Sequence, residues 1–227
     1  MRKVLEVIVT SAADAIEAEA GGADRLELVR DLGVGGLTPD FDVVSAVLEA
    51  VRIPVRVMLR EYPTMSVDSE DEMRRLQLAA KHFAQLPVDG IVMGFVRNGS
   101  VDTCALDAIF SVAPDSRFTF HRAFEELADA EAGIRQLKQF KPIDRILTGG
   151  GDDDWARRKA RLIACQVAAD PEISILVGAG LSPDVPLGFA QTPELREIHI
   201  GRAARARHSV RGPVKREAVR QLRNLLQ

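Results

Sequence analysis

Cysteine is scarce in this chain. Only Cys104 and Cys165 occur among its 227 residues, and both fall in segments with helical character. Two widely separated cysteines indicate neither a disulfide framework nor a thiolate metal site. The pair is therefore interpreted as ordinary core or surface residues.

Long hydrophobic runs and an excess of positive charge are also missing. No apolar run approaches the ~18 to 20 residues that span a bilayer, and the first residues lack the apolar core of a secretory signal. The formal net charge is -3 and the sequence pI is about 5.9, which gives no electrostatic reason to expect a nucleic-acid partner. We expect a cytoplasmic protein without membrane or nucleic-acid partners.

What the sequence does contain is a regular alternation of short apolar runs and amphipathic segments. Eight strand-then-helix units follow one another through residues 1–227 without a linker, and this predicts one α/β domain, a closed (β/α)8 barrel. An open doubly wound sheet is the alternative. The expected strands are Val4–Val9, Arg25–Val29, Val55–Arg60, Val88–Phe95, Arg117–His121, Asp144–Thr148, Ile173–Val177 and Glu197–Ile200.

The helices follow from capping and spacing signals. Thr38 and Pro39 predict a helix start, and Ser69 with Glu72 has the spacing of a capping box. One helix is expected over Glu125–Phe140, and another opens at Ser182.

Polar side chains are unusually frequent within or directly after the predicted strands. The stretch RFTFHRAFEE ends a strand on His121 and Arg122, a common way to present a base or a ligand to a pocket. In a closed barrel such side chains meet at the carboxyl ends of the strands. The whole set is Glu6, Thr10, Glu27, Arg60, His121, Arg122, Thr148 and His199.

These residues have a structural and a functional interpretation. A carboxylate inside a barrel is costly unless it is paired, so Glu6 and Glu27 predict cationic partners, with Arg56, Arg60 or His121 available. Such a network could serve stability alone. The functional interpretation makes Glu6, Glu27, Arg60 and His121 a catalytic set, in which carboxylate and imidazole exchange protons and arginine holds an anion.

Metal binding is a further interpretation of the same groups. Glu27, His121 and His199 offer oxygen and nitrogen ligands, but no fixed spacing such as HExxH marks them, and no metal ligand is assigned. A strand-end lysine is also missing, which disfavours a Schiff-base mechanism.

Glycines cluster after the last three strands. Backbone amides and one cation at this rim predict a site for a small anionic ligand. Tight strand-to-helix turns are the alternative explanation. The predicted anion-binding residues are Gly149, Gly150, Gly178, Gly180, Gly201 and Arg202.

Eight segments, taken in order, resemble the CutC family of copper homeostasis proteins. They are LEVIVTS, GGADRLEL, GGLTP, IPVRVMLR, TFHRAFEE, DRILTGG, LVGAG and EIHIG. The resemblance implies a single barrel of the triosephosphate-isomerase type, in the cytoplasm and as a homo-oligomer. It also implies that Glu6, Glu27, Arg60 and His121 form the shared site.

The chain departs from that family in two places. Family members discussed as copper binders carry cysteines in the first two strands, where this chain has Ile8 and Val29. Monovalent copper prefers soft thiolate ligands, so the resemblance implies copper as a cofactor by name while these substitutions argue against direct copper binding. A glycine-rich loop after Arg60 is replaced by REYPTMSV.

Three functions follow as hypotheses. The first is a CutC-type role in copper homeostasis. The second is a barrel enzyme, an isomerase, epimerase or lyase, acting on a small anionic or phosphorylated metabolite. The third is an interaction scaffold, which predicts a featureless barrel mouth.

Overall fold

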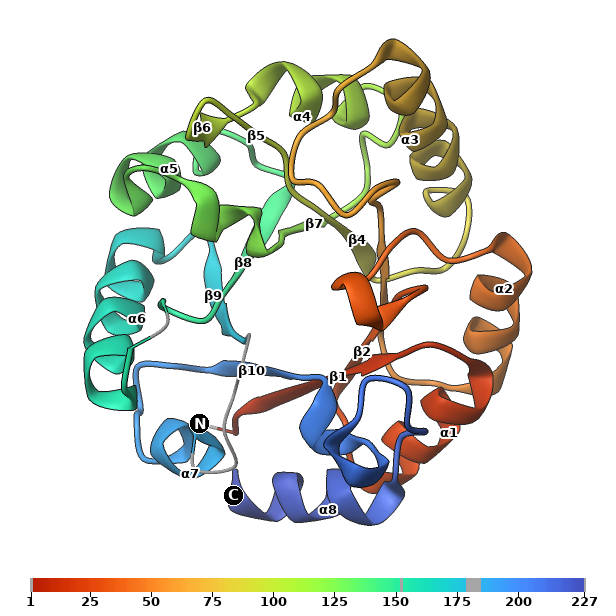
Figure 1. The fold of residues 1–227 in the computed structure, drawn as a ribbon, viewed down its shortest axis with the longest axis vertical. Coiled ribbons are helices and arrows are strands. Elements are labelled where there is room, and N and C mark those ends of the chain that lie inside the picture. The colour runs from red at the N-terminus through yellow and green to blue at the C-terminus, as the bar shows by residue number, and fades with distance from the viewer. Residues whose placement is uncertain (1, 152, 179–184, 227) are drawn as a thin grey trace.

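Short segments rich in valine, isoleucine and leucine form a closed parallel barrel in the computed structural model, which describes residues 2–151, 153–178 and 185–226 (Figure 1). Around the barrel the strand order is β1-β10-β9-β8-β7-β4-β3-β2. The predicted (β/α)8 barrel is thereby confirmed. Its strands are β1 (Val4–Val9), β2 (Arg25–Leu28), β3 (Val55–Met58), β4 (Gly90–Met93), β7 (Phe118–Phe120), β8 (Ile143–Thr148), β9 (Ser174–Val177) and β10 (Glu197–Ile200).

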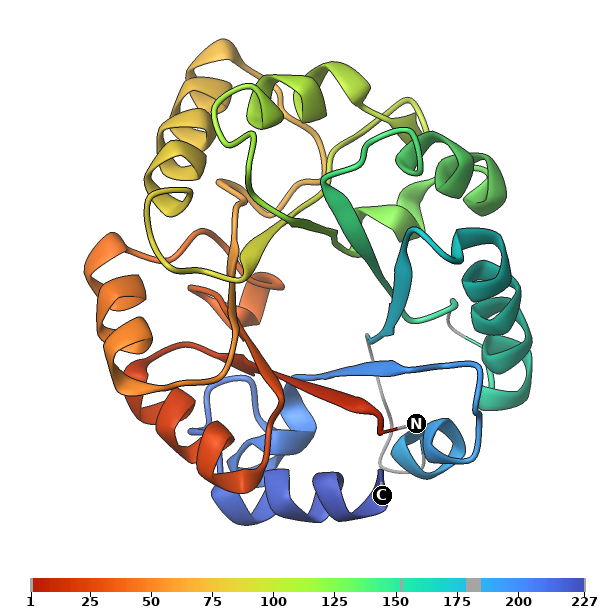
Figure 2. The ribbon, with the colours of Figure 1, turned by 180° about the vertical axis from the view of Figure 1, so that it is seen from behind.

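The helices form a ring outside the strands, as the views from both ends show (Figures 1 and 2). Several begin at a side chain that accepts a backbone amide. Ser69 Oγ accepts from Glu72 N at 3.1 Å, which confirms the predicted cap, while the Glu72 carboxylate accepts from Asp68 N at 3.0 Å, one residue before the position that a capping box uses. Within the described residues the α-helices are α1 (Ala12–Gly21), α2 (Phe41–Ala50), α3 (Glu70–Phe83), α4 (Thr103–Phe110), α5 (Ala130–Leu137), α6 (Trp155–Ala169), α7 (Val185–Ala190) and α8 (Arg216–Leu225).

Thr38 does not start a helix, contrary to the prediction. Helix α2 begins at Phe41 after Asp40, and Thr38 instead holds the end of β3. Its hydroxyl accepts from the Arg60 amide at 2.9 Å and donates to the Arg60 carbonyl at 3.0 Å. A residue that resembles a helix cap in the sequence therefore fixes the backbone of a site residue.

The helix predicted over 125–140 is also divided. A 3-10 turn, η2 (Arg122–Glu126), comes first, and α5 starts only after Asp129, whose carboxylate accepts from Ala132 N at 3.0 Å. The predicted helix start at Ser182 lies outside the described residues.

A small hairpin was not predicted. Strands β5 (Val96–Arg97) and β6 (Ser100–Val101) are antiparallel and are joined by a turn of two residues. These are Asn98 and Gly99, which have φ values of 53° and 71°. An Asn-Gly pair is the usual sequence signal for this type of turn.

Two apolar layers hold the barrel. The main core lies between the strands and the helices. A second, smaller cluster contains Ile8, Val29, Met58 and Val92, one from each of the first four strand units. Their side chains pack together, so the two positions where thiolates were expected are filled by a compact apolar group.

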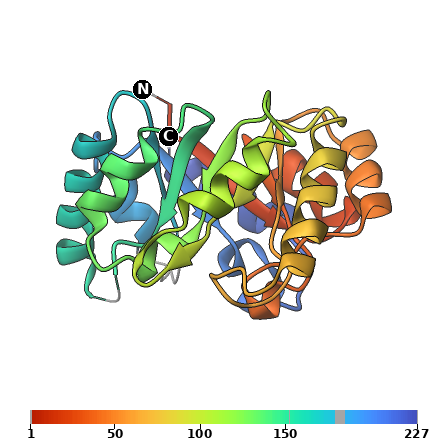
Figure 3. The same cartoon turned by 90° about the horizontal axis from the view of Figure 1, so that it is seen from above.

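One end of the barrel carries the longer loops. Seen from the side, the segments after β2, β3 and β10 project together from the end opposite the chain termini (Figure 3). Two of them are closed by isolated bridges, Arg30 to Leu37 and Arg205 to Val214. This is the carboxyl end of the strands, where barrels of this kind place their sites. No helix in the described ranges is long and apolar enough to cross a membrane.

Candidate functional site

A chain of ion pairs runs through the barrel interior below the loop-bearing end. Arg25 contacts Glu6 and lies 2.6 Å from Glu197, which in turn contacts Arg145 at 2.7 Å. The chain continues through Asp144, Arg56 and Asp89. Polar residues thus replace a purely apolar filling, and each buried charge in the chain has a partner.

The partners of Glu6 and Glu27 are not those that the sequence predicted. Arg56, proposed as a partner, contacts Asp89 at 2.8 Å and Asp144 at 2.7 Å instead. Arg25, two residues before Glu27 on the same strand, fills that role for Glu6. Alternate residues of a strand point to the same face, and this spacing was the signal that could have identified Arg25.

His199 joins the two buried glutamates. Its Nδ1 lies 2.8 Å from Glu6 Oε1, as a hydrogen bond, and 3.2 Å from Glu27 Oε2. Glu27 Oε2 receives no hydrogen bond from the described residues. The Nδ1–H of His199 therefore donates to Glu6. Glu27 Oε2 lies close to the same nitrogen but receives no hydrogen bond from it.

The three groups titrate differently. Burial raises the pKa of Glu27 to about 7, and the nearby Glu6 carboxylate adds to this rise against the opposing effect of His199. Burial also acts to raise the pKa of Glu6, but Arg25 and His199 outweigh it and hold that pKa well below its usual range. Burial disfavours the imidazolium of His199, yet Glu27 and Glu6 raise its pKa. Glu27 is thus the carboxylate that can exchange a proton near neutral pH.

His121 presents the other ring of the site. It caps η2, with Nδ1 accepting from the Ala123 amide at 3.1 Å. Burial lowers the pKa of His121 to about 3, and Arg60 and Arg122 lower it further. The neutral ring therefore carries its hydrogen on Nε2, and this buried Nε2 has no hydrogen-bond partner in the described part of the chain.

Gly94 makes room for this ring, and the sequence analysis did not identify it. A Cβ at Gly94 would lie 2.6 Å from His121 Nδ1 and 3.1 Å from the Cβ of Ala123. Any larger residue would push the imidazole out of its capping position. A glycine at the end of a strand is a weak sequence signal for such a contact.

Arg60 is a buried cation without a carboxylate. Its side chain is 7% exposed, and within the described ranges no acidic oxygen lies at ion-pair distance from it. It donates only to carbonyls, those of Thr64 at 3.2 Å and Gly36 at 3.4 Å. Burial lowers the pKa of Arg60; the more distant Glu126 carboxylate opposes this effect, and Arg122 acts in the same direction as burial. A buried, unpaired guanidinium is the expected receptor of a negatively charged ligand.

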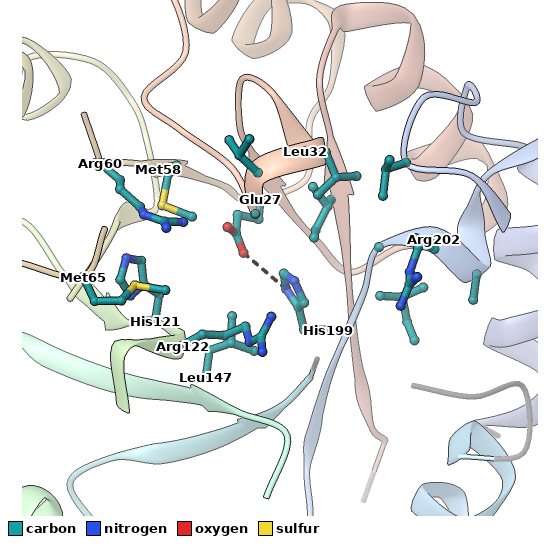
Figure 4. A pocket seen from close by; sticks show the side chains of 18 residues that line it. Glu27, Leu32, Met58, Arg60, Met65, His121, Arg122, Leu147, His199 and Arg202 are labelled. Carbon is teal, nitrogen blue, oxygen red and sulfur yellow. Dashed lines mark ion pairs between the residues drawn. The ribbon is translucent and has the colours of Figure 1, made fainter. Parts of the chain in front are cut away.

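Glu27, Arg60, His121 and His199 line one cavity of about 380 Å³ at the carboxyl end of the barrel. Figure 4 shows the Glu27 carboxylate between Arg60 and His121 on one side and His199 on the other. Glu6 lies beneath and is 1% exposed. Three of the four predicted catalytic residues thus share the cavity, and the fourth contacts it through His199.

The predicted anion-binding glycines are arranged less uniformly. Gly149 N donates to Glu125 at 2.7 Å, Gly150 N to the Thr148 hydroxyl at 3.1 Å, and Gly178 N to the Thr148 carbonyl at 2.9 Å. These amides are already engaged within the protein. Gly180 lies outside the described residues, while Gly201 and Arg202 line the cavity.

The residues that could form a metal site are not the three that the sequence indicated. The atoms that approach one another within 4.8 Å belong to Glu6, Glu27 and His199, whereas His121 uses Nδ1 to accept from Ala123. A hydrogen bond from His199 to Glu6 accounts for the closest spacing in this group, and the guanidinium of Arg25 adjoins it. A cation there would have to displace that proton beside a fixed positive charge.

Comparison with known proteins agrees with this architecture. The profile of the CutC family matches residues 3–204. A family protein CutC from Xylella fastidiosa (strain 9a5c) is 36% identical over 197 residues, covering 86% of this chain and 73% of its own. One from Histophilus somni is 28% identical over 209 residues, covering 92% of this chain and 86% of its own.

A solved structure shows the same fold. The protein named for copper homeostasis, CutC, from Streptococcus agalactiae superposes with a TM-score of 0.79 at 24% identity, covering 88% of this chain and 98% of its own. Since the family profile spans most of the sequence, the chain belongs to the CutC family.

Proposed function

We propose that this protein is an enzyme that moves a proton to and from a carbon atom of a small anionic metabolite, as an isomerase, epimerase or lyase does. One observation carries the proposal: Glu27, with a pKa of about 7, lines the same cavity as the neutral His121, whose buried Nε2–H has no hydrogen-bond partner among the described residues. A base poised near neutral pH and a fixed hydrogen-bond donor are the two parts that such a reaction needs.

Each residue has a role in the proposed reaction. Arg60 holds a negative group of the substrate, and Glu27 takes the proton from the carbon next to a carbonyl. The electron pair of that C–H bond moves to the carbonyl oxygen, which accepts from His121 Nε2–H. Return of the proton from Glu27 to the neighbouring carbon, with transfer of the hydroxyl proton to the former carbonyl oxygen, completes an isomerisation. Return to the same carbon from the same face restores the substrate, and an epimerisation also needs a proton donor on the opposite face.

The neutral state of His121 matters for this role. An imidazole whose pKa is about 3 donates a hydrogen bond without giving up its proton at neutral pH. The developing oxyanion is then stabilised by a donor already in place. His199, next to Glu27, favours the carboxylate form that accepts the substrate proton.

Deuterium exchange tests the proposal. The protein is incubated in deuterated buffer with a panel of small hydroxy acids, keto acids and their phosphates, and loss of a C–H signal is followed by NMR. We expect a substrate whose exchange rises about tenfold from pH 6 to pH 8, since Glu27 must be ionised, and falls about a hundredfold or more in Glu27→Gln.

Glu217→Gln is the matched control. Glu217 lies on α8, where it pairs with Arg220 at the surface. Exchange should be unchanged in this variant. Exchange that persists in Glu27→Gln, or a panel without any exchanging compound, would contradict the proposal.

Copper homeostasis is the second candidate function, favoured by the name of the structural relative from Streptococcus agalactiae. The residues present do not fit a thiolate site for monovalent copper. Ile8 and Val29 fill the expected positions within one apolar cluster, Cys104 is exposed on α4, and Cys165 lies on α6. Any part in copper homeostasis therefore depends on chemistry other than cysteine coordination in the first two strands.

A copper titration checks this conclusion. Metal-free protein titrated with monovalent copper against a competing chelator should show no tight stoichiometric site. The double variant Ile8→Cys/Val29→Cys places two thiols in that cluster, and we expect it to bind one copper ion. Tight binding by the unmodified protein would refute the inference drawn from Ile8 and Val29.

A further inference from the structure

A second cation lines the cavity at a distance from the first. Arg202 follows β10 and Gly201, and its side chain is exposed at the mouth. In Figure 4, Arg202 and Arg60 lie on opposite sides of Glu27 and His199. The cavity therefore has a positive charge at each end and the proton-accepting carboxylate between them.

Neither arginine forms a close ion pair in the part of the chain that the structure describes, although the Glu126 carboxylate acts on Arg60 from beyond that distance. In the ranges that the structure describes, the guanidinium groups of Arg60 and Arg202 have no carboxylate within ion-pair distance. By contrast, Arg122, which also lines the cavity, pairs with Glu125 at 2.9 Å. Arg60 donates to two loop carbonyls but to no carboxylate in the described ranges, so the charge at each end remains available to an anionic ligand.

Apolar side chains make up part of the cavity wall. Ile8, Leu32, Met58, Leu147 and Ile200 line it around Glu27. Such a wall fits the carbon skeleton of a ligand, and a cavity of about 380 Å³ fits only a small one.

We infer that the substrate class is a small acid with negative groups at both ends, a carboxylate or phosphate at each, whose carbon skeleton passes Glu27. This inference rests on the proposed proton transfer and adds the class of substrate that the cavity binds. Arg60 binds one anionic group in the buried interior, beside His121 Nε2. Arg202 binds the other at the mouth, so a ligand with a single charge leaves one guanidinium unused.

Calorimetric titration with matched probes tests the inference. The two-ended probes are 2-phosphoglycolate and 3-phosphoglycerate, and the one-ended probes are glycolate and inorganic phosphate, all at the same pH and ionic strength. We expect at least one two-ended probe to bind about tenfold or more tightly than either one-ended probe. Arg60→Met and Arg202→Met should each reduce its affinity to the level of a one-ended probe.

Arg207→Met is the matched control because Arg207 lies in the same loop as Arg202, is exposed, and does not line the cavity. It should leave every affinity unchanged. Inorganic phosphate that binds as tightly as both two-ended probes, or an Arg202→Met variant with unaltered affinity, would overturn the inference.

The outcomes separate the two proposals. Two-ended binding that needs both arginines and survives Glu27→Gln supports the inference even if no compound exchanges its proton. Proton exchange on one-ended acids that is insensitive to Arg202→Met overturns the inference while leaving Glu27 as the base.

Discussion

Replacing Arg25 with methionine should lower the free energy of unfolding by about 3 to 5 kcal/mol, the range for removing one partner of a buried ion pair. Arg25 is 4% exposed, contacts Glu6, and lies 2.6 Å from Glu197. Its loss leaves Glu6 with only His199 and Glu197 with only Arg145 as partners inside the barrel. Urea denaturation at pH 7 measures the effect.

Arg216→Met provides the comparison. Arg216 pairs with Glu17 at 2.8 Å, but both side chains are largely in solvent, at 47% and 39% exposure. Exposed pairs contribute about 1 kcal/mol or less, so this variant should change stability little. Equal losses in the two variants would mean that the interior ion chain does not stabilise the fold as we infer.

Glu27→Gln should have the opposite effect on stability. The pKa of Glu27 is about 7 in the folded protein, above its value in an unfolded chain. The folded state then binds the proton more tightly, so stability falls as the pH rises between those two values. Removing the ionisable group should raise the free energy of unfolding by about 3 kcal/mol at pH 8 and by much less at pH 5.

Denaturation curves of both proteins at pH 5 and pH 8 test this prediction. If Glu27 serves catalysis at the expense of stability, the Glu27→Gln variant should be more stable at pH 8 and should also lose the exchange activity. A variant that is less stable at pH 8 would show that the carboxylate serves the ion network.

The sequence was sufficient for the barrel because its signals are local. Apolar runs of strand length alternate with capped amphipathic helices, and Ser69 caps α3 as the spacing predicts. The meeting of Glu27, Arg60 and His121 also followed, since carboxyl ends of parallel strands share one end of a barrel.

Other features depend on contacts between distant segments. The strand spacing places Arg25 on the same face as Glu27, but its pairing with Glu6, like that of His199, depends on the register between neighbouring strands, which the sequence pattern does not determine. The amides of Gly149 and Gly150 are engaged by Glu125 and by the Thr148 hydroxyl, through side-chain conformations that a glycine motif does not reveal.

Gly94 also offers a criterion for reading related sequences. The imidazole of His121 can accept from the Ala123 amide only while position 94 carries no side chain. A relative that keeps the histidine but has alanine or serine at that position must move the ring, and it would then lose the hydrogen bond from the Ala123 amide that keeps the hydrogen on Nε2. One residue outside the cavity lining would then tell which homologues can share this chemistry and which have kept the barrel alone.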